Sequence, residues 1–172
     1  NRQAQGRSMK DKILKWVCII GCPPLVFEEA TKEALIERFK SRYKHKLSEL
    51  QEQIDALEAG DLMEFLDCVC DESVYLAQDV LELQHAGFDV NGAMEAVISN
   101  NESKVSLNQE FIAREHAKLV MRDKENNWFV ETNLYEGELH HCIRHYDTNK
   151  ITKFVDFEEV DLTPFVPKRY LE

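Results

Sequence analysis

The chain has 172 residues, enough for one domain or for one domain with an appendage, and 44% of them are hydrophobic, enough to build a core. Its net charge is −11 and it has no basic stripe to bind phosphates, which argues against direct binding of nucleic acid. No apolar run reaches the roughly 18–20 residues of a transmembrane helix, so no membrane partner is expected. The five cysteines are odd in number and follow no repeated spacing, which is typical of a reduced, cytoplasmic protein.

The first residues are predicted to contribute little to the fold. Residues 1–8 precede Met9 and are interpreted as the remnant of an expression tag. Residues 9–105 are predicted to form an all-α core, and residues 106–172 a C-terminal extension. An apolar stretch opens the core, and Pro23-Pro24 ends any helix there.

Two long helices are predicted next. The first ends at Gly60, in the place of a C′ glycine, and the second runs from Asp61 to His85, where Asp61 and Glu64 have the form of a capping box. Each helix has apolar residues at steps of three and four, and these faces are expected to be buried. They are Leu35, Phe39, Tyr43, Leu47, Leu50, Ile54 and Leu57 on the first helix, and Leu62, Phe65, Leu66, Val69, Leu76, Ala77, Val80 and Leu83 on the second.

The tight turn between the two helices predicts an antiparallel pair, as in a helical bundle. A short helix is expected from Gly92 to about Asn100, and another, capped by Ser106, to about Lys118. The tail from Asp161 is predicted to be extended. Three strands are expected to form a small antiparallel meander: Trp128–Glu131, His140–Tyr146 and Ile151–Phe157. The predicted fold class is therefore mainly α, with an antiparallel helical-bundle core and a small C-terminal antiparallel β appendage.

The acids are distributed unevenly. From Leu47 to Ser103 the chain has 57 residues with 14 acids and no lysine or arginine. Acids without basic partners repel one another, so something else is expected to neutralise them. Hard divalent cations such as Mg²⁺ or Mn²⁺ suit carboxylate oxygens.

Five of these acids are placed to act together. Glu64, Asp67 and Asp71 fall within roughly 60° of one another on a helix, and Glu49 and Glu52 are neighbours on the preceding helix. Because the two helices turn back on each other, the two groups are expected to face each other. The alternative is an ordinary solvated face, on which Glu64 serves only as a cap. The lack of Lys and Arg favours metal binding, since a nearby ammonium would compete with the cation.

The other acids of these two helices are predicted to be solvated. They are Asp55, Glu58, Glu72, Asp79 and Glu82.

The order of the motifs suggests a family. The chain contains Glu49-x-x-Glu52, then Glu64-x-x-Asp67, then Asp71, Tyr75 and the segment Asn101-Glu-Ser-Lys104. This order resembles the MazG-like, phosphoribosyl-ATP-pyrophosphohydrolase-like branch of the all-α nucleoside triphosphate pyrophosphatases. Their signature is E-x-x-E, E-x-x-D, an Asp, a Tyr and a segment like S-N-x-S-K. The resemblance covers about residues 13–105, and Ser48 stands where many relatives have a further Glu.

The resemblance implies a Mg²⁺-dependent enzyme, with Mn²⁺ as a substitute, that cleaves a (d)NTP or a related nucleotide to a monophosphate and pyrophosphate. It also implies a homodimer or homotetramer, since one helical hairpin cannot enclose a nucleotide. Carried over by position, the metal ligands and catalytic acids are Glu49, Glu52, Glu64, Asp67 and Asp71, and the substrate-binding residues are Tyr75, Asn101 and Lys104.

Other interpretations stay open. The alternative function is a non-catalytic helical module that binds nucleotides or another protein. A zinc site at His140, His141, Cys142 and His145 is disfavoured, because the spacing matches no usual ligand arrangement and neighbours on a strand point to opposite faces. Cys68 is predicted to be a packing residue near the pocket.

Overall fold

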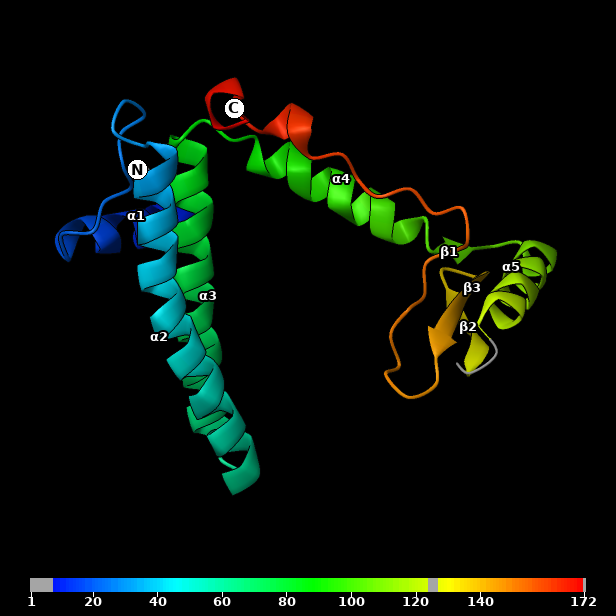
Figure 1. Ribbon diagram of the computed structural model, residues 1–172. Coiled ribbons are helices and arrows are strands. Elements are labelled where there is room, and N and C mark those ends of the chain that lie inside the picture. Colours follow the sequence, from blue (N-terminus) through cyan, green and yellow to red (C-terminus); the bar gives the residue numbers. More distant parts are fainter. Residues whose placement is uncertain (1–7, 124–126, 172) are drawn as a thin grey trace, which may run out of the picture. The chain divides into compact units, whose positions relative to one another are not determined.

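The computed structural model describes residues 8–123 and 127–171, and this part of the chain is mainly α (Figure 1). The helices are α1 (Met9–Ile19), α2 (Lys32–Ala59), α3 (Leu62–His85), α4 (Val90–Glu102) and α5 (Gln109–Arg122). The strands are β1 (Val105–Ser106), β2 (Trp128–Tyr135) and β3 (Glu138–His145). The prediction of a mainly α fold with a small antiparallel sheet in the C-terminal half is confirmed. None of the described helices is long and apolar enough to cross a membrane.

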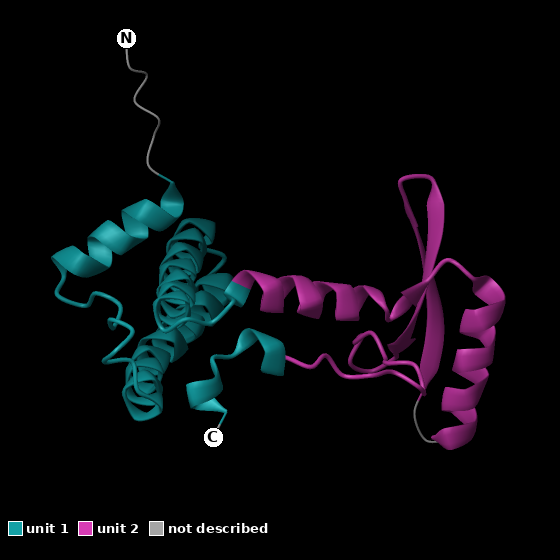
Figure 2. Cartoon of the chain, turned by 90° about the horizontal axis from the view of Figure 1, so that it is seen from above, with its two compact units in different colours: residues 1–90, 163–172 teal, residues 91–162 magenta. Residues whose placement is uncertain are grey.

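The chain divides into two compact units (Figure 2). Unit 1 is Asn1–Val90 together with Thr163–Glu172, and unit 2 is Asn91–Leu162. The division by contacts therefore falls after Val90, whereas the sequence-based division falls after residue 105. It also assigns Thr163–Glu172 to unit 1, whereas the sequence-based division assigns these residues to the C-terminal extension.

Unit 1 begins with a capped helix. The Ser8 hydroxyl accepts a hydrogen bond from the Asp11 N–H, and the Asp11 carboxylate accepts one from the Ser8 N–H. This reciprocal pair is a capping box, which satisfies donors at the start of α1. Ser8, the last residue of the segment expected to be a remnant, thus caps α1. Residues 1–7 lie outside the described residues.

The turn between α2 and α3 has the predicted glycine and the predicted N-cap, but not the predicted capping box. Gly60 adopts the left-handed conformation, with φ of 71°, and ends α2. The Asp61 side chain caps α3 by accepting hydrogen bonds from the backbone of Met63 and Glu64. In a capping box, the Asp61 N–H would bind the Glu64 carboxylate, but it donates instead to Ala56 O, 2.9 Å away. Glu64 therefore takes no part in the cap through its side chain.

Helices α2 and α3 run side by side and antiparallel (Figure 1). More than half of the predicted apolar residues of the two helices are nevertheless exposed, so the helices pack through a different side. Leu47 and Ile54 of α2 are 60% and 50% exposed, and Leu62 of α3 is 70% exposed. The buried residues between the helices include Ala56 and Cys68. The prediction that Leu47, Ile54 and Leu62 are buried is wrong, whereas Leu35 of the same predicted face is buried. Periodicity identifies the residues that share a face, but not what covers that face.

The exposed apolar face of the α2–α3 pair is extensive, and we refer to it as the outer seam. Its members are Tyr43, Leu47, Leu50, Ile54, Leu57, Leu62, Leu66 and Leu76, each at least 40% exposed.

The core of unit 1 lies where α2 begins and α3 ends. Leu35, at the start of α2, packs with Ala30, Ala86 and Tyr170. A second cluster joins α1 to α3. The tail therefore completes the core, and the prediction that it is extended is wrong. It forms two 3-10 helices, Thr163–Phe165 and Lys168–Tyr170, and the Tyr170 hydroxyl donates a hydrogen bond to Ala30 O.

Unit 2 contains the sheet, in which β3 lies between β1 and β2. The β2–β3 hairpin turns at Glu136 and Gly137, whose φ values of 50° and 86° fit a two-residue hairpin turn. The predicted strand Ile151–Phe157 is wrong: Ile151 forms only an isolated bridge with Arg144, and β1 is the third strand. Helix α5 covers the sheet, because its Ile112 and Leu119 pack with Ile143 of β3. Its cap is Asn108, not the predicted Ser106.

Candidate functional site

The carboxylates of α2 and α3 come close enough to affect one another. Burial raises the pKa of Glu49, and the negative charges of Glu52, Asp71 and Asp67 raise it further. His45, one turn earlier on α2, acts in the opposite direction and lowers it. Because Asp67 and Asp71 belong to α3, acids of both helices meet at Glu49.

Cys68 lies within this group. Its sulfur and one carboxylate oxygen each of Glu49 and Glu52 lie within 4.8 Å of one another. Cys68 is only 3% exposed, and burial raises the pKa of its thiol, followed by the charges of Glu64, Glu52 and Glu49. The structure therefore places Glu64 near the same group. We refer to Glu49, Glu52, Glu64, Asp67 and Asp71 as the carboxylate group.

No ammonium or guanidinium neutralises the carboxylate group within residues 8–123 and 127–171, since none of its five members forms an ion pair there. The Ser48 hydroxyl donates a hydrogen bond of 3.1 Å to Glu52 and so orients it. Several carboxylates without cationic partners match the oxygen donors that Mg²⁺ and Mn²⁺ prefer. The donor set therefore fits a divalent cation.

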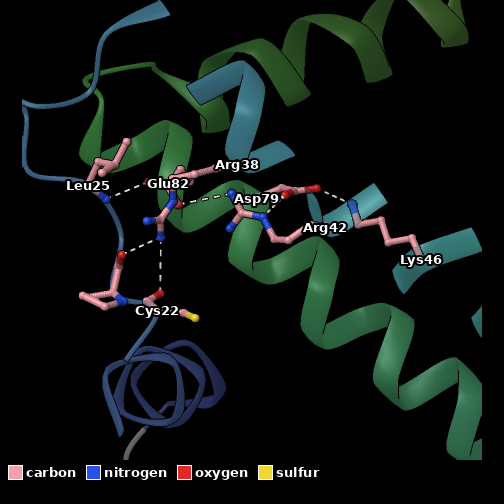
Figure 3. Close-up of polar contacts among 8 residues, drawn as sticks. Cys22, Leu25, Arg38, Arg42, Lys46, Asp79 and Glu82 are labelled. Atoms are coloured by element: carbon pink, nitrogen blue, oxygen red, sulfur yellow. Dashed lines mark hydrogen bonds and ion pairs between the residues drawn. The ribbon is translucent and has the colours of Figure 1, made fainter. Parts of the chain in front are cut away.

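The acids nearer the end of α3 are neutralised by cations of α2 (Figure 3). Arg38 and Arg42 reach the Glu82 carboxylate at 3.0 and 3.1 Å, and Asp79 pairs with Arg42 and Lys46. Glu82 is only 1% exposed. The prediction that Asp79 and Glu82 are solvated is wrong, because their partners come from the helix alongside and not from α3 itself.

The same network attaches the loop after α1. Glu82 accepts a hydrogen bond of 2.7 Å from the Leu25 N–H, and Arg38 donates to Pro23 O at 2.6 Å. The loop is thereby held against α2 and α3 (Figure 3).

A cavity of about 370 Å³ lies between this loop and the two helices. On its wall the rings of His45 and Tyr75 stack with their centroids 5.9 Å apart. Burial and the charges of Glu49 and Asp71 raise the pKa of Tyr75, so the cavity adjoins the carboxylate group. The full lining is Ile20, Gly21, Cys22, Arg38, Ser41, Arg42, His45, Tyr75 and Gln78. The cavity therefore offers donors and aromatic rings beside the acids.

Two predicted substrate-binding residues belong to unit 2. The Lys104 ammonium donates a hydrogen bond to the Asn101 side chain and lies 5.4 Å from the centre of the Phe157 ring. The structure thus brings Asn101 and Lys104 together at the end of α4.

The histidines of β3 form no metal site among the described residues. There, one group of His, Cys, Asp and Glu side chains has metal-ligand spacing, and it is Glu49, Glu52 and Cys68. His141 instead lies 2.8 Å from the Thr132 hydroxyl on the neighbouring strand.

Sequence analysis missed Arg38, Arg42 and His45 as residues of this region, and it treated Cys68 as packing. The available signal was their periodicity: Arg38, Arg42, His45 and Glu49 recur at steps of three and four, so they share one face of α2. That face is the one that packs against α3. No protein-family model, curated protein or solved structure matches this chain.

Proposed function

We propose that the protein is a Mg²⁺-dependent nucleoside triphosphate pyrophosphohydrolase that converts a (d)NTP or a related nucleotide to a monophosphate and pyrophosphate. One observation carries the proposal. The carboxylate group, which forms no ion pair among the described residues, adjoins a cavity whose lining includes Arg38, Arg42, His45 and Tyr75. The acids suit a divalent cation, and the cavity suits the rest of a nucleotide.

A bound Mg²⁺ would supply Lewis-acid polarisation of a phosphoryl oxygen and a more acidic water. The residues of the chain would do the rest. Glu49 and Glu52 from α2, with Glu64, Asp67 and Asp71 from α3, would hold the cation. Water would add to the α-phosphorus as the bond to the β-phosphate breaks, so that pyrophosphate leaves.

The substrate would occupy the cavity. Tyr75 and His45 would contact the nucleotide beside the acids, and the guanidinium of Arg42 would favour its negative charge. The family resemblance also implies Asn101 and Lys104 as substrate-binding residues, and these belong to unit 2 and not to the lining of the cavity. These two residues already form a hydrogen-bonded pair in unit 2.

The outer seam supports a homodimer or homotetramer. Exposed apolar patches of this kind mark contacts with other molecules, and the seam runs along both long helices. Packing two or more α2–α3 pairs through their outer seams would make the predicted antiparallel helical bundle. The carboxylate group and the cavity would then remain available for the cation and the nucleotide.

The deciding experiment measures pyrophosphate release from each common ribonucleotide and deoxynucleotide, with Mg²⁺ and with EDTA. Release that requires Mg²⁺ supports the proposal and identifies the base and sugar. No release from any nucleotide contradicts it.

The outer seam also favours a second candidate, a non-catalytic module that binds a nucleotide or another protein. Thermal unfolding separates the two functions, since a ligand that binds only the folded state raises its stability by about 2.7 kcal/mol at a concentration 100 times its Kd. Stabilisation by Mn²⁺ and a non-hydrolysable nucleotide, without turnover of any nucleotide, would favour the module.

A further inference from the structure

The thiol of Cys68 is out of place in a site for a hard cation. It is 3% exposed, and its sulfur and one carboxylate oxygen each of Glu49 and Glu52 lie within 4.8 Å of one another. A cysteine that only packs is expected among apolar groups. This one is buried against two carboxylates, and Mg²⁺ makes no use of a sulfur ligand.

We propose that Glu49, Glu52 and Cys68 form a binding site for a thiophilic divalent cation of the Zn²⁺ class. Two hard oxygens and one soft sulfur match the ligands of Zn²⁺, which binds carboxylate oxygen and cysteine sulfur together. The proposal rests on the donor atoms alone and holds whether or not the chain hydrolyses nucleotides.

The geometry is close to what such a cation needs. Zn–S bonds of about 2.3 Å and Zn–O bonds of about 2.0–2.2 Å place tetrahedral ligand atoms about 3.5 Å apart. The three donors lie within 4.8 Å of one another, so they need to approach by little more than about 1 Å. Glu49 and Glu52 come from consecutive turns of α2 and Cys68 from α3, so one cation would join the two helices. The fourth position would take water.

Two features of the surroundings suit a cation there. The Ser48 hydroxyl orients Glu52 from outside the group, as a residue supporting a metal ligand does. A dipositive ion would also offset the repulsion among the acids, and the thiol proton would pass to solvent as sulfur binds. If the proposed hydrolase activity holds, Zn²⁺ at this site competes with Mg²⁺ for Glu49 and Glu52.

The test reads the metal–sulfur bond directly, so its failure is distinct from a failure of the enzymatic proposal. Cd²⁺ is titrated into the full chain, and the ultraviolet charge-transfer band of the cadmium–thiolate bond is recorded. The exposed Cys18, Cys22 and Cys70 are first replaced by serine, so that they cannot contribute to the band. The expected result is a band that saturates at about one equivalent and that Zn²⁺ abolishes in competition.

Matched variants then assign the ligands. In this background Cys68→Ser is expected to lose the band, while Cys142→Ser, which replaces the other buried cysteine, keeps it. Glu52→Gln changes an exposed side chain and so preserves the fold, and it is expected to weaken Cd²⁺ binding by about 10-fold or more. Glu58→Gln, on the same helix but outside the group, serves as its control. The proposal is overturned if the band survives Cys68→Ser, or if Glu52→Gln binds Cd²⁺ with the same affinity as the parent chain that carries the three serines.

Discussion

The guanidinium of Arg42 donates a hydrogen bond of 3.1 Å to the buried carboxylate of Glu82, although the two residues are 40 positions apart. The same guanidinium lies 3.0 Å from Asp79. These contacts divide the acids of the α2–α3 pair into two groups. The acids near the end of α3 have cations from α2 beside them, whereas those nearer the Gly60 turn meet one another.

Glu82 is expected to be essential for the stability of unit 1. Glu82→Gln leaves the guanidinium groups of Arg38 and Arg42 without their buried anion. Removing one partner of a buried ion pair costs about 3–5 kcal/mol, so the free energy of unfolding is expected to fall by about 3 kcal/mol. Urea unfolding followed by circular dichroism measures it. The control is Glu37→Gln, because Glu37 pairs with Lys40 on the surface and should change stability little. Equal effects of the two variants would contradict this assignment.

Glu49 is expected to destabilise the fold at neutral pH when no cation is bound. Its pKa is raised above the ordinary value by burial and by Glu52, Asp71 and Asp67. Between the ordinary and the raised value the folded chain holds a proton that the unfolded chain has lost, so stability falls as pH rises through this window.

Glu49→Gln removes that penalty. In EDTA, the variant is expected to have a higher Tm than the wild type at neutral pH and to lose less Tm as the pH rises above the ordinary pKa of a glutamate, about 4.3. Adding Mn²⁺ should then raise the Tm of the wild type more than that of the variant. A variant that is less stable than the wild type at neutral pH, without metal, would show that the acids at Glu49 do not repel one another.

The double variant Glu64→Gln with Asp67→Asn tests the proposed catalysis. Loss of even a residue that only supports a metal ligand costs about 10–100-fold, so loss of two ligands is expected to lower pyrophosphate release by about 100-fold or more. The circular dichroism spectrum should not change, because both side chains are exposed. Glu58→Gln, also exposed and acidic, should keep full activity. Full activity of the double variant would remove these acids from the mechanism.

The outer seam is expected to hold copies of the chain together. Leu47→Glu with Ile54→Glu places charges on this apolar face and should reduce the mass measured by light scattering to that of one chain. Met121→Glu is the control, since Met121 is an exposed apolar residue of unit 2. A wild-type mass equal to one chain would contradict the oligomer.

Unit 2 is expected to lose stability in acid through Glu115. Hydrogen bonds from Lys118 and from the Val155 N–H lower the pKa of this buried carboxyl. A lowered pKa contributes stability above the ordinary value, about 4.3, and that stability is lost as pH falls through the folded value. With Trp16→Phe, the fluorescence of Trp128 reports on unit 2. There, Glu115→Gln should be less stable at neutral pH and should depend less on pH in acid. If the stability of unit 2 depends on acidic pH in Glu115→Gln as strongly as without this change, the dependence arises from other carboxyls.

The helix limits near the Gly60 turn were predictable because they depend on local chemistry. A glycine in the left-handed conformation and an aspartate at the N-cap act on neighbouring backbone groups, so the sequence is sufficient to locate them. The third strand was not predictable in the same way. The predicted strand from Ile151 has β-like residues, but β3 pairs instead with two residues that precede α5, and only long-range contacts decide that choice.

By itself, the sequence determined that the chain is mainly α, that two long helices meet at Gly60, and that the acids between Leu47 and Ser103 have no cation beside them along the chain. These properties follow from composition, period and caps, which are local. The tertiary structure decided which face of each helix is inside, because burial depends on what packs there. It placed Arg38 and Arg42 against Glu82, left the leucines of the outer seam outside, and brought the Cys68 thiol to the carboxylates of Glu49 and Glu52.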